Sequence, residues 1–380
     1  MDTVLSYVEW RGDLSLSKSP FNEVDNLIFS LLCYLPLEGV VPSPGKRKIS
    51  LVRAAEMYFA EHPVPECPQK AEHARSTLEW LFYRMAVSER YRKMYLSDMI
   101  SVTEESGEEQ FAAMCIHMDR KNIYAAFRGT ADKLVGWKED FLLSCLSEIP
   151  SQKQALLYLT DIGERYPEAV LHTGGHSKGG NLAVYAAAGV PAAIQDRIAS
   201  VWSNDGPGFR TDFLTGKGYK RIRSRIREII PESSVVGILL SHDNSYEIVS
   251  SSQIGLMQHD GFSWEVSGTH FVQREGLSGQ SILMDIKIRD WLENIPDTEK
   301  KETIDTLFEL LAASGATTLS EVRKGKLKVA AAALPQMAQL SKEIRDNILD
   351  FLMLVEQLSI RLAMESRISK TLKSILDPEE

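Results

Sequence analysis

The chain has 380 residues, of which 44% are hydrophobic and 25% are charged, and its formal net charge is −9 at pH 7. These values are typical of a folded globular protein, and they exclude a low-complexity chain. The negative charge argues against nucleic acid or an anionic membrane as the main partner. No apolar run approaches the roughly 18 residues that a membrane span requires.

The cysteines lack the C-x-x-C spacing of a metal or redox site. They are Cys33, Cys67, Cys115 and Cys145. The N-terminus has no positively charged segment before an apolar core, so it does not match a signal peptide. We therefore expect reduced thiols, a cytoplasmic location and no metal or cofactor. The triplet Arg11-Gly12-Asp13 is expected to be a turn between a strand and a helix, not an adhesion motif.

The first hundred residues are expected to form a strand over residues 4–10, followed by helices. Apolar residues recur at helical spacing from Val24 to Leu32 and again over residues 71–86, which predicts two helices. Prolines at positions 36, 42 and 44 separate the two segments.

From about residue 110 the pattern alternates between strand and helix. Strands are expected at 111–118, 122–127, 169–172, 198–202, 225–230 and 264–266, and helices at 137–146, 152–165 and after residue 178. Such alternation is typical of an α/β fold with a mostly parallel sheet flanked by helices. In these sheets the site lies at the carboxyl ends of the strands.

The last part of the chain has a different character. It carries apolar residues at helical spacing, which are Ile304, Leu307, Phe308, Leu311, Ile344, Ile348, Phe351, Leu352, Val355 and Leu358. We therefore divide the chain into an α/β domain at residues 1–296 and a helical C-terminal appendage at residues 297–380. The appendage is expected to pack on the α/β core of the same chain. The alternatives are that it caps the site or makes a homo-oligomer contact.

The segment Gly175-His176-Ser177-Lys178-Gly179 lies between a predicted strand and a predicted helix. Strand, G-x-S-x-G and helix together form a nucleophile elbow, in which the serine takes a strained backbone conformation. Small flanking residues leave room for that turn. We therefore predict that Ser177 is a nucleophile, and we expect His176 to face its own backbone turn.

A serine hydroxyl is a poor nucleophile until a base removes its proton and a third group orients that base. After an elbow of this type the acid and then the histidine follow in the chain. The histidines that follow are His242, His259 and His270. Of these, His259 lies in a loop just before the predicted strand at Trp264.

Three further segments carry a resemblance to a known family. Phe127-Arg128-Gly129-Thr130 resembles the F-R-G-[ST] oxyanion segment of class 3 (fungal-type) lipases. Trp137 and Asp140 are similar to the W-x-x-D of that family, and His259 with Trp264 is similar to its H-x-G-x-x-W loop. Four ordered motifs are far more specific than the elbow alone.

Residues 1–295 are more similar still to an uncharacterised bacterial branch of lipase-like α/β-hydrolases. The shared features are W-R-G-D at residues 10–13, H-S-K-G-G-N at residues 176–181 and N-D-G-P-G-F at residues 204–209. The C-terminal helices lie outside the lipase resemblance.

The resemblance implies an α/β-hydrolase fold and a set of roles. His259 would be the general base, and the backbone amides of Thr130 and Lys178 would form the oxyanion hole, with the Thr130 hydroxyl as a further donor. One such donor contributes about 3–4 kcal/mol to transition-state stabilisation.

The acid is the point of departure from the lipases, whose aspartate comes in a D-x-V-P loop. Ser234 stands in that register here. We favour Asp205, at the end of the preceding strand, over the alternative Glu232, and place Asp243 and Asp260 behind both. A structural role for Asp205 as a helix cap is the competing explanation.

The sequence therefore predicts a serine hydrolase of the esterase or lipase type, which acts on a small-molecule acyl ester or lipid through an acyl-enzyme. Acyl transfer to another acceptor would use the same residues. The alternative is a hydrolase fold retained as a catalytically weak or inactive binding or regulatory module.

Overall fold

An eight-stranded β-sheet forms the centre of the protein in a computed structural model, which describes residues 2–64, 74–104, 109–131, 133–243 and 246–350. The strands lie side by side in chain order. They are β1 (Ile49–Ser50), β2 (Tyr95–Glu104), β3 (Glu109–His117), β4 (Asn122–Phe127), β5 (Val170–His176), β6 (Ile198–Asn204), β7 (Ile226–Pro231) and β8 (Glu247–Val249). Pairing is antiparallel from β1 to β4 and parallel from β4 to β8. The predicted α/β fold is confirmed.

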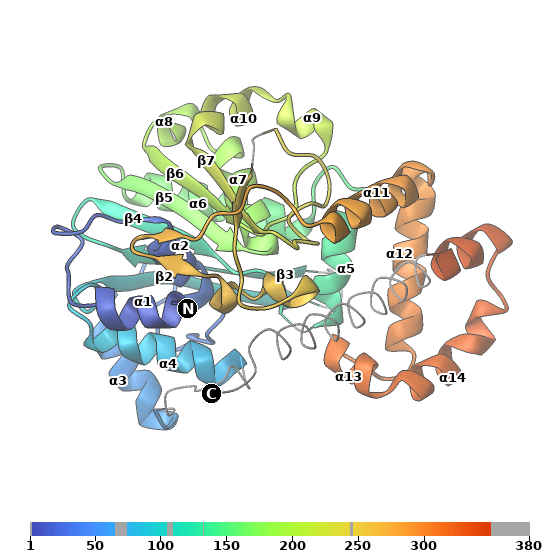
Figure 1. The fold of residues 1–380 in the computed structure, drawn as a ribbon, viewed down its shortest axis with the longest axis horizontal. Helices are drawn as coiled ribbons and strands as arrows, with labels where there is room; N and C mark the ends of the chain where they lie inside the picture. Colours follow the sequence, from blue (N-terminus) through green and yellow to red (C-terminus); the bar gives the residue numbers. More distant parts are fainter. Residues whose placement is uncertain (1, 65–73, 105–108, 132, 244–245, 351–380) are drawn as a thin grey trace, which may run out of the picture.

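Helices cover both faces of the sheet (Figure 1). Alternate residues of β4 separate the two cores: Tyr124 and Ala126 face one, whereas Ile123, Ala125 and Phe127 face the other. The first core is closed by α1 (Val4–Arg11), α2 (Glu23–Leu32), α3 (Leu51–Glu61) and α4 (Ala74–Val87). The second is closed by α6 (Pro150–Arg165), α7 (Lys178–Gly189), α8 (Ala192–Gln195), α9 (Thr211–Leu214) and α10 (Lys217–Ile222).

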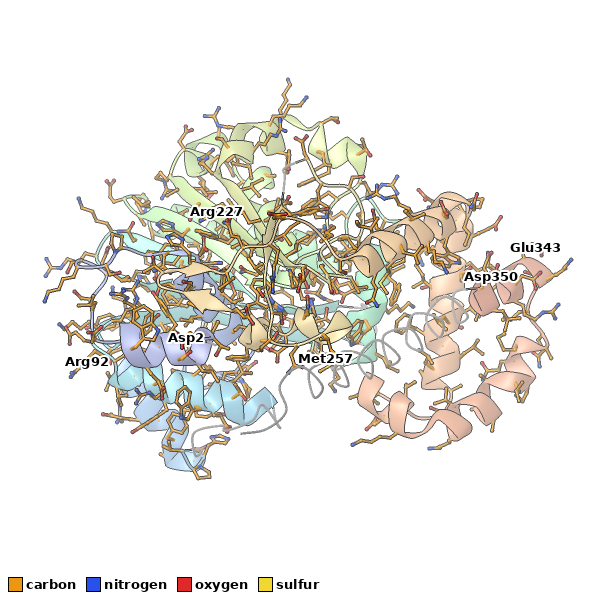
Figure 2. The ribbon with its side chains drawn as sticks, viewed as in Figure 1. Asp2, Arg92, Arg227, Met257, Glu343 and Asp350 are labelled. Atoms are coloured by element: carbon orange, nitrogen blue, oxygen red, sulfur yellow. The ribbon has the colours of Figure 1, made fainter. Side chains whose placement is uncertain are left out.

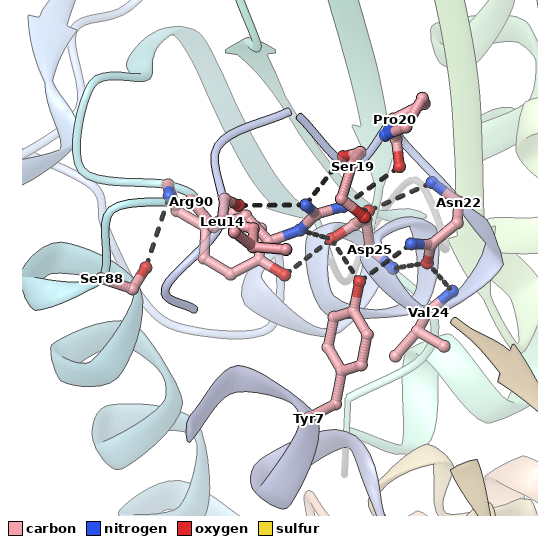
Figure 3. Close-up of polar contacts among 10 residues, drawn as sticks. Tyr7, Leu14, Ser19, Pro20, Asn22, Val24, Asp25, Ser88 and Arg90 are labelled. Atoms are coloured by element: carbon pink, nitrogen blue, oxygen red, sulfur yellow. Dashed lines mark hydrogen bonds and ion pairs between the residues drawn. The ribbon is translucent and has the colours of Figure 1, made fainter. Parts of the chain in front are cut away.

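A buried ion pair links α2 to the turn that follows α4 (Figure 3). Arg90 contacts both carboxylate oxygens of Asp25, and both side chains are inaccessible to solvent. The guanidinium also donates to the carbonyls of Leu14, Ser19 and Pro20. Tyr91 donates to the same carboxylate at 2.7 Å. Each charged atom of the pair thus has partners, as burial of a charge requires.

The parallel half of the sheet positions the site. Helix α5 (Leu134–Leu142) and α6 connect β4 to β5, α7 and α8 connect β5 to β6, and α9, α10 and the 3₁₀ turn η1 (Arg223–Arg225) connect β6 to β7. The carboxyl ends of β4, β5, β6 and β7 therefore meet at one edge. Past β8 the chain forms the 3₁₀ turns η2 (Gly255–His259) and η3 (Gly261–Ser263) and a hairpin of β9 (Val266–Ser267) and β10 (His270–Phe271).

The C-terminal helices extend to one side of the sheet (Figure 1). They are α11 (Gly279–Glu293), α12 (Asp297–Ala312), α13 (Leu319–Lys324) and α14 (Lys326–Met337). Ile304 and Phe308 of α12 pack with Leu134 and Leu142 of α5 in a small apolar cluster. Within the described ranges, none of the helices has the length and apolar character that crossing a bilayer requires.

Several expected elements differ from the structure. Residues 4–10 form helix α1 and not a strand, because Val4, Tyr7 and Val8 are buried at the spacing of one helical face. The strand expected at residues 264–266 is the short β9, and Trp264 forms only an isolated bridge with Ser251.

The turn expected at residues 11–13 is present, although it follows a helix. Cys33, Cys115 and Cys145 are buried free thiols, and burial raises the pKa of Cys33 to about 12. Three sets of expectations lie outside the described residues: Cys67, the first three positions of the helix at 71–86, and the apolar positions from Phe351 onward.

Candidate active site

Ser177 lies in a sharp turn between β5 and α7. Its backbone has φ 58° and ψ −135°, a strained region for a residue with a side chain. A Cβ added at Gly179 would lie 2.2 Å from the carbonyl oxygen of Phe127, so only glycine fits there. The Ser177 amide donates to the carbonyl of Asn204 at 2.9 Å, which ties the turn to the end of β6.

The next residue along β6 is Asp205, which is fully buried. Its Oδ2 accepts a hydrogen bond of 2.6 Å from Nδ1 of His259. Its Oδ1 accepts from the Ser234 hydroxyl and, at 3.1 Å, from the amide of Gly237. The residue in the register of the lipase aspartate therefore holds a carboxylate that comes from the neighbouring strand.

The other candidate acids lie elsewhere. The Glu232 carboxylate is 3.6 Å from the guanidinium of Arg274. Asp243 pairs with Arg223 at 2.8 Å. The Asp260 side chain caps η3 through the amide of Phe262.

The other candidate histidines contact other carboxylates. His242 lies 3.2 Å from Glu228. His270 is largely exposed beside Glu23. Of the three histidines considered, the structure brings His259 to the elbow.

His176 anchors the loop that carries His259, and the expectation that it faces its own turn is wrong. Its Nε2–H donates to the carbonyl of His259 at 2.7 Å, and the two rings lie 4.6 Å apart. Burial lowers the pKa of His176 to about 3, so its ring is neutral. Since Nε2 carries the proton, Nδ1 accepts from the Tyr34 hydroxyl at 3.1 Å.

The predicted oxyanion segment passes directly against the elbow. A Cβ added at Gly129 would lie 3.0 Å from Cβ of Ser177 and 2.4 Å from the carbonyl oxygen of His176. Glycine therefore allows the backbone leading to Thr130 to approach the serine. Lys178 is the first residue of α7, and the first amides of a helix have no intrahelical acceptor.

The Thr130 hydroxyl is engaged by α5. It donates to Oδ2 of Asp140 at 2.5 Å. Burial raises the pKa of Asp140 to about 6, while the Lys178 ammonium opposes that rise. The Thr130 hydroxyl is therefore already engaged by a carboxylate.

The side chain of Lys178 extends away from the turn into the protein. Its ammonium is 2.6 Å from Oε2 of Glu139, and both side chains are inaccessible to solvent. The ammonium also donates to the carbonyl of Gln110 at 3.1 Å.

These contacts bring His259, whose ring bonds to the Asp205 carboxylate, to the same edge of the sheet as the strained Ser177. In the described part of the chain, no group of three or more histidine, cysteine, aspartate and glutamate side chains could hold a metal ion.

A family model described as Mbeg1-like matches residues 85–309, which is more than half of the chain. The chain belongs to the Mbeg1-like family. The match contains the elbow, His259 and Asp205, and it extends into α12. A search of curated proteins gave no match.

Solved structures similar to this Mbeg1-like chain include three lipases. The M37 lipase is 16% identical, with 50% of this chain and 68% of that chain covered and a TM-score of 0.32. The lipase from Rhizopus microsporus var. chinensis is 16% identical, with coverages of 49% and 70% and a TM-score of 0.31. The Lip2 lipase from Yarrowia lipolytica is 12% identical, with coverages of 66% and 84% and a TM-score of 0.35.

Sequence reasoning missed several residues of this Mbeg1-like site. Tyr34 follows α2, Gln110 is the second residue of β3 and Glu139 lies on α5, so no local spacing links them to the elbow. Asn204 was quoted only as part of a motif, yet its side chain donates to the carbonyl of Gly175 at 3.0 Å. A signal did exist for Glu139, because Lys178 is a charged residue at a position that an elbow buries.

Proposed function

We propose that this protein is a serine hydrolase of the esterase or lipase type. The observation that carries the proposal is the 2.6 Å hydrogen bond between Asp205 and His259, beside a serine whose φ is positive. A strained serine turn and an imidazole oriented by an aspartate are both features of nucleophilic catalysis. The fold itself requires neither of them.

In the proposed reaction Ser177 Oγ attacks the carbonyl carbon of an ester. Asp205 occupies Nδ1 of His259, so Nε2 is the ring nitrogen that accepts the serine proton. The amides of Thr130 and Lys178 would donate to the oxygen that becomes negative. The buried carboxylate stabilises the imidazolium that forms, and it keeps its own charge.

The attack forms a tetrahedral intermediate, and its collapse completes the acylation step. The imidazolium of His259 gives its proton to the departing alkoxide, and an acyl group stays on Ser177. Water then attacks the acyl carbon while His259 takes a proton from it, and that proton returns to Ser177 as the acid leaves. The substrate class that fits is a carboxylic ester, either a small acyl ester or a lipid.

The test uses the full chain and two readouts. Wild type should hydrolyse p-nitrophenyl esters and become labelled by a fluorophosphonate. Ser177→Ala should abolish both while the melting temperature stays close to that of wild type. Ser147→Ala is a matched control, because Ser147 lies in the loop after α5, and it should keep full turnover.

Absence of both turnover and labelling in wild type would contradict the proposal. The remaining interpretation would be a hydrolase fold that acts as a binding or regulatory module. Ester turnover that survives in Ser177→Ala would likewise contradict it, because the chemistry would then depend on another group.

A further inference from the structure

A charged pair lies directly under the nucleophile elbow. Lys178 and Glu139 approach to 2.6 Å, and neither side chain has solvent access. Pairs of this kind give little or no net stability relative to apolar residues of similar volume, because both ions lose their hydration. Folding stability alone therefore does not account for a lysine at this position.

The ammonium is connected to the oxyanion segment by a first route through Gln110. The carbonyl of Gln110 accepts from Lys178 Nζ at 3.1 Å. The side-chain oxygen of the same residue accepts from the amide of Ala131 at 2.8 Å. Ala131 follows Thr130 directly, so one glutamine holds both the elbow lysine and the segment that faces the serine.

A second route passes through α5. Glu139 pairs with Lys178, and its neighbour Asp140 accepts from the Thr130 hydroxyl. The ammonium also lies 3.7 Å from Oδ1 of Asp140. Glu139 is itself fixed, because its Oε1 accepts from the amide of Ser151 at 2.8 Å, in the first turn of α6.

We propose that the Lys178–Glu139 pair is a positioning device that holds the two oxyanion amides at a set separation. The backbone of Lys178 supplies one amide. Its side chain contacts β3 and α5, whose Gln110 and Asp140 bind the loop after β4 that supplies the other. This inference rests on the proposed function. A donor removed from an oxyanion hole costs about 10²–10³ in turnover, so a displaced donor should cost a large part of that.

The experiment replaces the pair with apolar residues and keeps the backbone amide. Lys178→Met/Glu139→Leu leaves no charge unpaired, but the buried Ser151 amide loses its acceptor, so the variant should fold with a moderately lower melting temperature than wild type. Turnover of a p-nitrophenyl ester should fall about 30- to 100-fold while KM changes less than about twofold. Affinity for an alkylboronic acid, whose adduct on serine presents an anionic oxygen, should fall by a similar factor.

Lys178→Met/Glu139→Gln is the second variant, because it leaves no charge unpaired and keeps an acceptor oxygen for the Ser151 amide. If the first variant does not fold, turnover by this second variant should still be lower than that of wild type. Lys138→Met is the matched control. Lys138 is the neighbouring residue of α5, and its ammonium pairs with Asp305 of α12 at 2.8 Å, so its kinetics should equal those of wild type.

The outcomes separate the two proposals. A wild type with neither turnover nor fluorophosphonate labelling would remove the proposed function and this inference with it. An active wild type with unchanged kcat and boronate affinity in the folded variants would overturn this inference alone. A loss confined to melting temperature would also overturn it, because the pair would then be only structural.

Discussion

Two residues at the carboxyl edge of the sheet have a backbone that is unfavourable for side chains other than glycine. Ser177 has φ 58° at the end of β5, and Asp205 has φ 49° at the end of β6. Each such conformation costs about 1–3 kcal/mol. Adjacent parallel strands thus end in two strained residues, which present the proposed nucleophile and the proposed acid to the same histidine.

Asp205→Asn should lower kcat by about 10³–10⁴, because an amide at this position no longer fixes the imidazole in the tautomer that accepts the serine proton. Ester hydrolysis and circular dichroism would measure activity and folding together. Glu232→Gln is the control, and it should change kcat by less than about twofold because Glu232 faces Arg274. A larger loss in Glu232→Gln than in Asp205→Asn would reverse the assignment.

Asp140→Asn should change how stability depends on pH. Burial raises the pKa of Asp140 to about 6 in the folded protein, against about 3.8 when unfolded. Between those values the folded state holds the proton more tightly, so this group favours folding at low pH and the benefit is lost as pH rises. Wild type should therefore lose stability relative to Asp140→Asn from pH 4 to pH 6, as measured by urea unfolding.

The site could be predicted from the sequence only where chemistry follows local spacing. Ser177 and Thr130 occur in motifs that can be read directly. The choice between Asp205 and Glu232 depended on which strand end faces His259, which is a matter of three-dimensional register. Tyr34 and Gln110 gave no signal, because their contacts to the elbow join segments that are far apart in the sequence.

At the scale of elements, the parallel half could be predicted better than the antiparallel half. The alternation of β4, α6, β5 and α7 follows the hydrophobic pattern closely. Strand β2 was not predicted, because a bulge lies between Ser97 and Ile100 and Asp98 within it has φ 56°. Asp98 is nevertheless buried, where Arg165 and Tyr166 compensate its charge.

Arg90→Met should destabilise the protein by about 3–5 kcal/mol, because it leaves the buried Asp25 carboxylate without its cation. Urea unfolding would measure the change. Arg53→Met is the control. Arg53 pairs with Glu56 on the surface, where both side chains are more than half exposed, so the expected change is within about 1 kcal/mol. Equal effects in the two variants would mean that burial does not set the strength of these pairs.

Contacts also link the C-terminal helices to the site, although the boundary at residue 296 stays a prediction. The amide of Leu134, at the start of α5, donates to the carbonyl of Thr317 at 3.0 Å. Helix α5 carries Glu139 and Asp140, so the appendage packs on the helix behind the oxyanion segment. The homo-oligomer expected through these helices likewise stays a prediction.

At the scale of the whole molecule, several large apolar side chains lie on the surface. Met257, labelled in Figure 2, is 61% exposed on the turn that leads to His259. Ile282 and Ile286 of α11 are about half exposed. These side chains could not be assigned to the surface from the sequence, because the hydrophobic pattern does not separate them from core residues.

Buried histidines should make the protein sensitive to acid. Burial lowers the pKa of His117 and His172 to about 4 and that of His176 to about 3. The unfolded chain takes up these protons below about pH 6.5 and the folded protein does not, so stability is lost as pH falls. Burial also raises the pKa of Asp140 and of Asp260, and these two groups oppose the effect of the histidines. The three histidines outnumber them, so the free energy of unfolding should be lower at pH 5 than at pH 7.5.

Urea unfolding across that range checks the direction, and His117→Gln checks the cause. The variant should flatten the pH dependence by at most about 1.4 kcal/mol per pH unit, which corresponds to one proton. An unchanged slope would assign the acid sensitivity to other groups.

The origin of the buried carboxylate on β6 has a consequence for how this scaffold can diversify. The stretch of chain after β7 supplies only a hydroxyl and a main-chain amide to that carboxylate, and both come from its first few residues. The rest of that loop does not have to supply a carboxylate to the histidine. A designer can therefore exchange that loop while Ser177 and Asp205 stay at the ends of two adjacent central strands.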